Sequence, residues 1–309
     1  MTEYYLAVDG GGTKTKVLCT DENGTIIGES LAGPTSLTVT TIGAASFNLI
    51  EAIRQVVENK PEITQFKAVV LGLAGVDTST EQKRADEVFR RALAQYHFEH
   101  FWLVNDSEIA LANGTDNPNA LILVSGTGSI CYGRNELGAS VRVSGMDYLL
   151  ADQGSAYSIG RKVLTEATKS FDGRGPKTIL EKKLCESFMI ATFAEIKGEI
   201  YNPDFGKGEV ARLAPFCTAA AQEGDVVALR IVQEEINEMV ISAQTVLDKV
   251  FIPDKSFDCV FSGSVLGVDM ISQGIRDQLL VKYPTLHFVR QEKQPVFGAL
   301  KIAMGLGKQ

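Results

Sequence analysis

Residues 4–30, YYLAVDGGGTKTKVLCTDENGTIIGES, contain three short apolar or β-branched runs separated by a glycine-rich loop and a polar turn. Strands are predicted at residues 4–8, 14–20 and 25–30. The tetrapeptide Asp21–Gly24 is a typical turn sequence, because Asp, Asn and Gly tolerate the backbone angles of tight turns. The segment therefore predicts three strands joined by a glycine loop and a hairpin turn.

The second half of the chain repeats this pattern. Residues 120–144 contain a strand-like run, the loop SGTGS, a second run, the turn NELG and a third run. From the threonine of each loop to the glycine of each turn is 11 positions, from Thr13 to Gly24 and from Thr127 to Gly138. Equal spacing in two similar segments indicates a duplicated β-loop-β-turn-β unit.

Each half also ends in a similar way. A strand-like run at residues 67–71 leads into GLAG, and one at residues 257–261 leads into SGS. Helical spacing of apolar residues is found at 43–59, 80–95, 209–222 and 225–250. The second half is longer because several helices are inserted between residues 155 and 250. The stretch NGTDNP, Asn113–Pro118, is the predicted hinge between the halves.

The composition argues against several classes of partner. The 309 residues carry a net charge of −8. Phosphate backbones and anionic lipid surfaces bind clustered cations, so we expect no nucleic-acid or membrane partner. The N-terminus lacks a basic segment followed by an apolar run, and no apolar stretch approaches the ~20 residues that span a bilayer. We therefore expect neither a signal peptide nor a transmembrane helix.

The cysteines and histidines predict neither disulfides nor a structural zinc site. The cysteines are odd in number and scattered, which favours free, buried thiols in a reducing, cytoplasmic compartment. The histidines form no cluster with cysteines or carboxylates. These residues are Cys19, Cys131, Cys185, Cys217, Cys259, His97, His100 and His287.

The two glycine-rich loops are the main candidates for ligand binding. Consecutive glycines in Asp9–Lys14 let backbone N–H groups approach an anion, and Thr13 adds a hydroxyl. This is neither a Walker A loop nor a dinucleotide loop, because a strand and not a helix follows. A simple hairpin turn would also explain these glycines. The equivalent loop Ser125–Ser129 favours two clamps on one triphosphate, and Ser262–Ser264 follows a buried strand where a loop can meet adenosine.

Asp106 has two possible roles. It follows a strand-like run at residues 101–104 and opens a helical run at 107–112. A carboxylate at a strand end can take the proton of a hydroxyl that attacks ATP. Alternatively, Asn105 or Asp106 caps the helix, with Glu108 completing a capping box. Both roles are compatible if Asn105 caps and Asp106 reaches the substrate.

The loops DGGGTK and SGTGS, the segment Asp152–Tyr157 (DQGSAY) and the late Gly263 together resemble the acetate/sugar kinase, Hsp70 and actin superfamily. Within it the chain is most similar to the BadF/BadG/BcrA/BcrD ATPase family, in its N-acetylglucosamine kinase branch. The resemblance implies an α/β, two-lobed, duplicated RNase H-like (actin/hexokinase-type) fold. Each lobe would be a mixed five-stranded sheet with helices, and the ATP cleft would lie between the lobes. The implied lobes are residues 1–117, joined by a C-terminal helix at 295–309, and residues 118–294 with a helical insertion at 155–250.

The resemblance also implies a function. It predicts a cytoplasmic kinase that uses ATP and Mg²⁺ to phosphorylate the primary hydroxyl of an amino sugar such as N-acetylglucosamine, N-acetylmuramate or glucosamine, and a homodimer. Asp106 matches the catalytic aspartate, and Asp9 would position Mg²⁺ through water, although a polar turn residue is the alternative there. The implied ATP contacts are Gly11, Gly12, Thr13, Lys14, Gly126, Thr127, Gly128, Ala214, Gly263 and Ser264. For Ala214, core packing in the helical run is an equally good account.

The implied sugar contacts depart from the family pattern in places. They are Ser36, Asp106, Ser129, Gly145, Met146 and Asp152. The family usually has asparagine where this chain has Ser36, and often Gly-Trp-Gly where it has Gly145-Met146-Asp147. A serine has a shorter reach, so the identity of the sugar stays open. Asp152 has a second interpretation, because Asp is a common cap and a helix is predicted to begin near Gln153.

Two other functions are alternatives to the sugar kinase. Activators of acyl-CoA dehydratases or reductases share the family name but hold a 4Fe–4S cluster through cysteines at a dimer interface, whereas the cysteines here are isolated in apolar runs. A non-catalytic, sugar-sensing or actin-like protein is the other alternative. A regulator of the related repressor-kinase type would carry an N-terminal helix-turn-helix, which we do not expect in a chain whose first strand begins at Tyr4.

Overall fold

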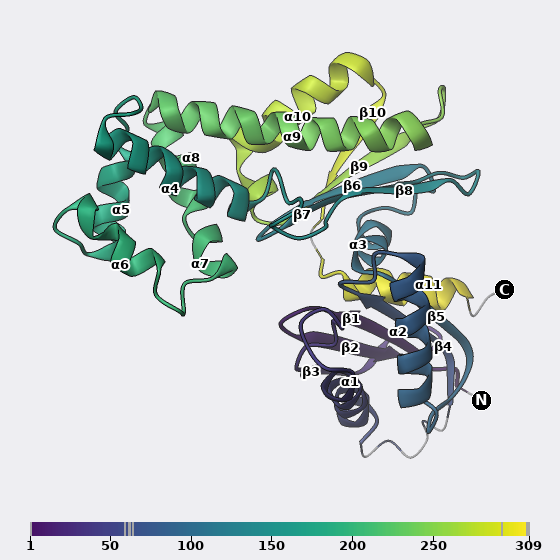
Figure 1. The fold of residues 1–309 in the computed structure, drawn as a ribbon. Helices are drawn as coiled ribbons and strands as arrows, with labels where there is room; N and C mark the ends of the chain where they lie inside the picture. The colour runs from purple at the N-terminus through teal and green to yellow at the C-terminus, as the bar shows by residue number, and fades with distance from the viewer. Residues whose placement is uncertain (1, 59, 61–62, 64, 292, 307–309) are drawn as a thin grey trace. The chain divides into compact units, whose positions relative to one another are not determined.

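The computed structural model divides the chain into two units. Unit 1 contains residues 1–116 and 291–309, and unit 2 contains residues 117–290. The structure describes the whole chain except residues 1, 59, 61–62, 64, 292 and 307–309. Each unit is built on a five-stranded mixed sheet (Figure 1).

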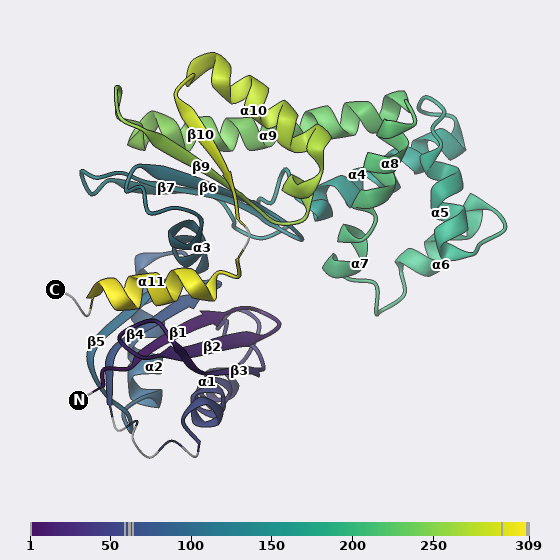
Figure 2. The same cartoon turned by 180° about the vertical axis from the view of Figure 1, so that it is seen from behind.

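Unit 1 is a sheet with helices on both faces. Its strands are β1 (Tyr5–Gly10), β2 (Thr15–Thr20), β3 (Ile26–Ala32), β4 (Gln65–Leu73) and β5 (His97–Asn105), in the order β3-β2-β1-β4-β5. β1 pairs antiparallel with β2 and parallel with β4. Its helices are α1 (Ile42–Val57), α2 (Ser79–Ala92), α3 (Asp106–Gly114) and α11 (Val296–Leu306). One core lies under α1 and α2, and a second lies under α3 and α11 (Figure 2).

Unit 2 has the same sheet with a larger helical part. Its strands are β6 (Ala120–Ser125), β7 (Ser129–Arg134), β8 (Ser140–Ser144), β9 (Phe257–Ser262) and β10 (Leu286–Arg290), in the order β10-β9-β6-β7-β8. The long helix α9 (Val226–Val250) packs on the sheet and against α10 (Asp269–Lys282). The other helices are α4 (Ala156–Asp172), α5 (Leu180–Phe188), α6 (Ile196–Ile200), α7 (Lys207–Ala211) and α8 (Ala214–Gln222), with short 3₁₀ turns η1 (Phe193–Glu195) and η2 (Val265–Gly267).

The predicted fold class is confirmed, because the two sheets have matching strand orders. The two hairpin turns match at the level of single hydrogen bonds. The Asp21 carboxylate accepts the N–H groups of residues two and four positions ahead, and the Asn135 side-chain oxygen does the same. Gly24 and Gly138 both have positive φ, 79° and 84°. Such angles favour glycine, which explains why the 11-residue spacing ends on this residue in both copies.

Several predicted helix boundaries are confirmed and two are wrong. Asn105 caps α3 in a capping box with Glu108, and Asp225 caps α9. The predicted single helix at 209–222 is two helices, α7 and α8, because a proline at position 215 cannot donate to the carbonyl of residue 211 and its ring would clash there. Asp152 does not cap a helix, since α4 begins at Ala156 with Ser155 as its cap.

The cysteine thiols are free and mostly buried. All five cysteines are free; four are buried, and Cys185 is half-buried. Burial raises the pKa of the Cys19 thiol and of the Cys217 thiol to about 12 each, which keeps both protonated and unreactive. Among the helices that the structure describes, none has the length and apolar character needed to cross a bilayer.

Candidate functional site

The first glycine loop follows β1 and is tied to the segment after β3. The Gly11 N–H donates to the Lys14 carbonyl at 2.9 Å. The Gly11 carbonyl in turn accepts the N–H groups of Thr35 at 3.2 Å and Ser36 at 3.3 Å. A Cβ at Gly10 would lie 2.2 Å from Thr35 Oγ1, so only glycine fits there. Residues 12–14 are exposed at the tip of the loop, where a ligand can reach them.

Ser36, one predicted sugar contact, is buried beside the end of β4. It is 2% exposed, and its hydroxyl shares a 2.8 Å hydrogen bond with Thr38 Oγ1. A Cβ on Gly75 would lie 3.0 Å from Ser36 Oγ, so the glycine leaves the hydroxyl its space. A hydroxyl has one donor and two acceptor sites, so Ser36 keeps hydrogen-bonding capacity beside its bond to Thr38.

The charge of Asp106, a second carboxylate of unit 1, affects the ionisation of Asp9. Asp9 is the penultimate residue of β1, and Asp106 is the first residue of α3. Burial raises the pKa of the Asp9 carboxyl to about 6; the negative charge of Asp106 adds to this rise, whereas Lys14 opposes it. A bound cation would remove the repulsion between the two carboxylates, so this pair fits a divalent metal held near Asp9.

Asn105 fixes the start of α3 and so fixes Asp106. The Asn105 side-chain oxygen accepts the Ser107 N–H at 2.9 Å, and its amide donates to the Val76 carbonyl at 3.2 Å and to Asp77 at 2.9 Å. Because Asn105 is the cap, the carboxylate of Asp106 is not needed for that role. This geometry is compatible with the prediction that Asn105 caps α3 while Asp106 contacts the substrate.

We expect Asp9→Asn to stabilise the metal-free protein at neutral pH. The pKa of Asp9 is about 6 in the folded chain against an ordinary 3.8, so folding loses stability as the pH rises through this window. Removing the charge should raise the free energy of unfolding by on the order of 2 kcal/mol at pH 8, with a smaller gain at pH 5. Urea unfolding in EDTA at both pH values measures these gains. Asp116→Asn is the control, because that side chain is 89% exposed; equal gains for both variants would contradict the prediction.

The second glycine loop is held by the start of α4. The Gly126 N–H donates to the Gly128 carbonyl at 3.0 Å, and the Gly126 carbonyl accepts the Ala156 N–H at 2.9 Å. Ser129 Oγ donates to the Gln153 carbonyl at 2.6 Å. The loop therefore has a fixed shape, in which Thr127 is the exposed tip.

Asp152 holds the same loop from the other side. Its carboxylate accepts the Ser129 N–H at 3.2 Å and a proton of Lys207 Nζ at 2.9 Å. A Cβ at Gly128 would lie 2.8 Å from this carboxylate, so only glycine lets Asp152 approach. Asp152 has φ of 68°, a left-handed angle that is uncommon for residues other than glycine. The structure thus brings together Gly128, Ser129 and Asp152, which the sequence predicted for ligand binding.

The remaining predicted sugar contacts lie between β8 and α4. Gly145 has φ of 73°, and a Cβ there would lie 2.9 Å from the Ile130 side chain. Met146 is 60% exposed. Asp147, also at positive φ, forms an ion pair with Lys207 that lowers its pKa.

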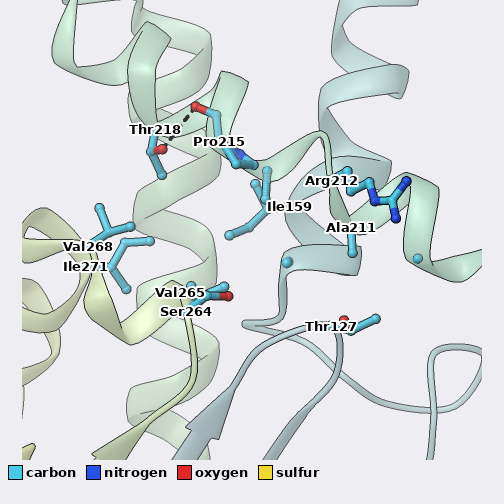
Figure 3. Close-up of a pocket in the computed structure, with 13 residues that line it drawn as sticks. Thr127, Ile159, Ala211, Arg212, Pro215, Thr218, Ser264, Val265, Val268 and Ile271 are labelled. Atoms are coloured by element: carbon cyan, nitrogen blue, oxygen red, sulfur yellow. Dashed lines mark hydrogen bonds between the residues drawn. The ribbon is translucent and has the colours of Figure 1, made fainter. Parts of the chain in front are cut away.

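A pocket of about 450 Å³ lies in unit 2 beside the second loop (Figure 3). Three of the residues predicted to contact ATP line it, namely Thr127, Ala214 and Ser264. Its size and its mainly apolar wall suit a purine nucleoside. Gly263 lets the segment after β9 pass close to Ser125 at the start of the second glycine loop. It has φ of 98°, and a Cβ there would lie 2.2 Å from the Ser125 carbonyl oxygen.

Most of the pocket wall was not predicted from the sequence. These residues come from α4, the α7–α8 region, η2 and the start of α10, and they are Ala156, Ile159, Gly208, Ala211, Arg212, Pro215, Thr218, Val265, Val268 and Ile271. Apart from Arg212 and Thr218 they are small or apolar side chains like those of any helical core, so their types alone do not distinguish a pocket wall from a core. Pro215 could have signalled a break within the helix predicted at 209–222, because proline does not continue a helix.

Two five-stranded mixed sheets of matching strand order, each carrying a glycine loop after its first strand, define a duplicated α/β protein of the actin/hexokinase type. The family model described as the BadF/BadG/BcrA/BcrD ATPase family matches residues 6–303, and the chain belongs to this family.

Curated relatives match along the full length. The chain is 32% identical over 303 residues to the N-acetylmuramic acid/N-acetylglucosamine kinase of Clostridium acetobutylicum, covering 97% of this chain and 98% of that one. It is 26% identical to the N-acetyl-D-glucosamine kinase of Dictyostelium discoideum, covering 99% of each. A solved structure of a provisionally assigned N-acetylglucosamine kinase from Chromobacterium violaceum has the same fold, with a TM-score of 0.73 at 21% identity, covering 97% of this chain and 99% of that one.

Proposed function

We propose that this chain is an ATP-dependent kinase that phosphorylates the primary hydroxyl of an amino sugar, most closely N-acetylglucosamine or N-acetylmuramate. The observation that carries the proposal is its 32% identity to the kinase of Clostridium acetobutylicum over nearly all of both chains. Glucosamine is the third candidate, since the chain is also 29% identical over 181 residues to the glucosamine kinase GspK of Vibrio cholerae.

Nucleotide binding is assigned to the glycine loops and the pocket of unit 2. The adenosine would occupy the apolar pocket lined by Thr127, Ala214 and Ser264. The glycine loop of each unit would offer backbone N–H groups to phosphate, from residues 12–14 in unit 1 and from Thr127 and Gly128 in unit 2. Mg²⁺ would be held near Asp9, largely through water, where it would neutralise charge on the phosphates.

Asp106 is assigned as the general base. It would accept the proton of the attacking hydroxyl, and the capping of α3 by Asn105 would keep its carboxylate in one position. Ser36, Ser129, Gly145, Met146 and Asp152 are assigned to the sugar. Asp152 suits this role because its carboxylate is almost fully buried and already fixed by two donors.

The burial of the cysteines argues against the alternative of an activator that holds a 4Fe–4S cluster. Four of the five are buried in the cores of the units, where they cannot reach a surface shared by two subunits. A cytoplasmic location and a homodimer stay predictions from the family resemblance.

An ADP-release assay on a panel of sugars tests the proposal. With ATP and Mg²⁺, we expect N-acetylglucosamine or N-acetylmuramate to give the highest kcat/KM, and glucose to be at least about tenfold poorer because it lacks the acylamino group that the site would recognise. Omission of Mg²⁺ should abolish turnover. Failure of all the amino sugars to stimulate ADP release would refute the proposal.

A further inference from the structure

Lys207, the first residue of α7, joins two carboxylates that are distant in the sequence. Its ammonium donates to Asp147 and, at 2.9 Å, to Asp152. Asp152 is only 3% exposed, and a buried carboxylate needs a compensating charge. Burial alone would lower the pKa of Lys207, but its hydrogen bonds to Asp147 and Asp152 outweigh this effect and raise it. The lysine therefore stays protonated and holds both partners.

The backbone from Ser144 to Asp152, which carries both carboxylates, is strained. Ser144, Asp147 and Asp152 all have φ between 64° and 68°, a region that costs free energy for residues with a Cβ. The Tyr148 ring within this segment lies 5.5 Å from the Lys207 ammonium and 4.9 Å from the Tyr157 ring. Such a backbone persists only where its surroundings hold it, and Lys207 contacts it near its middle and at its end.

Two further residues of α7 line the proposed nucleotide pocket. Gly208 and Ala211 line that pocket, and Arg212 follows directly. One short helix therefore contacts the proposed adenosine site through two of its residues and the 144–152 segment through its first residue. A nucleotide in that pocket would contact Gly208 and Ala211 and so restrict the helix whose first residue holds Asp152.

We propose that Lys207 is a positioning residue that holds Asp152 and the 144–152 segment in the sugar-binding conformation and makes sugar affinity depend on the nucleotide. This inference rests on the proposed kinase function. It assigns Lys207 no contact with the reacting atoms. Its effect should therefore fall on sugar binding and on the coupling between the two ligands, with kcat changed less.

The test compares Lys207→Met with Lys182→Met by isothermal titration. Lys182 is the matched control, because it forms an exposed ion pair with Glu186 in the same helical insertion. N-acetylglucosamine or N-acetylmuramate, whichever the wild type phosphorylates, is titrated with and without a non-hydrolysable ATP analogue. Lys207→Met should weaken sugar binding about tenfold and abolish the gain in sugar affinity that the analogue gives the wild type. Analogue affinity should change by less than about threefold, and Lys182→Met should behave as wild type.

The outcomes separate this inference from the proposed function. Wild-type sugar affinity in Lys207→Met, or a wild-type affinity that ignores the nucleotide, would overturn the role of Lys207 while leaving the kinase proposal intact. A wild type that phosphorylates no sugar would overturn both. If Lys207→Met fails to fold, Asp147→Asn provides the second test, because that side chain is 67% exposed. It should weaken sugar binding about threefold, and no change would again refute the inference.

Discussion

Asp106→Asn is expected to lower kcat about 10³-fold, since a positioned general base typically contributes 10²- to 10⁴-fold. Asparagine has the same shape but cannot accept the hydroxyl proton. The cap of α3 belongs to Asn105, so the fold of the site should survive the change. Sugar and ATP affinities should stay within about threefold of wild type. Steady-state kinetics with direct titration of both ligands makes the comparison.

Glu108→Gln is the matched control for this loss of turnover. Glu108 is another carboxylate in the first turn of α3, and it takes part in the capping box with Asn105. If disturbance of the helix start were the cause of inactivity, Glu108→Gln would be as poor as Asp106→Asn. We expect it to keep most of the wild-type kcat. Near-normal kcat in Asp106→Asn would remove Asp106 from the mechanism.

Gly263→Ala is expected to damage both stability and nucleotide binding. The new methyl group would lie 2.2 Å from the Ser125 carbonyl oxygen, and φ of 98° is unfavourable for alanine. Backbone cannot rotate away as a flexible side chain can, so β9 and the second glycine loop would have to separate. We expect a loss of about 3 kcal/mol in the free energy of unfolding and an ATP KM raised about tenfold or more.

The control for this substitution is Gly138→Ala in the β7–β8 turn. Gly138 has a similar φ of 84°, but a Cβ there would meet nothing within 4 Å. Gly138→Ala therefore introduces backbone strain without a steric contact. We expect it to lower the free energy of unfolding by about 1 kcal/mol and to leave the ATP KM unchanged. Urea unfolding and ATP kinetics on both variants isolate the contact with Ser125. Equal behaviour of the two variants would contradict the close approach of β9 to the loop.

The duplicated fold could be predicted because its determinants are local. The asparagine or aspartate that starts each turn and the glycine that ends it fix the hairpin by themselves, so their spacing can be recognised in the sequence. The cap at Asn105 is equally local, since Glu108 lies three positions away. Asp9 and Asp106 could be predicted as candidate site residues because each is a carboxylate at the end of a strand.

The rest of the site depends on contacts between distant segments. Lys207 reaches Asp152 across 55 positions and Asp147 across 60. An isolated lysine in a polar stretch is most simply explained as a solvated surface residue. Asp152 resembles an ordinary helix cap until its left-handed backbone and its two donors are known. The pocket wall is formed by side chains from four separate segments. Hydrophobic periodicity shows which face of a helix is buried but not which other helix packs against it.

The helix α11 closes the core of the unit that begins the chain. Val296, Ala299, Leu300 and Ala303 pack with residues of β1 and β4, and Gly298 allows backbone contact with α3. On the ribosome, unit 1 cannot complete its interior until α11 has been synthesised, after all of unit 2. Unit 2, which is continuous in sequence, can be finished earlier, so the usual N-to-C order of maturation is reversed here. Until α11 has been synthesised, the apolar residues that it covers in unit 1 are accessible to chaperones.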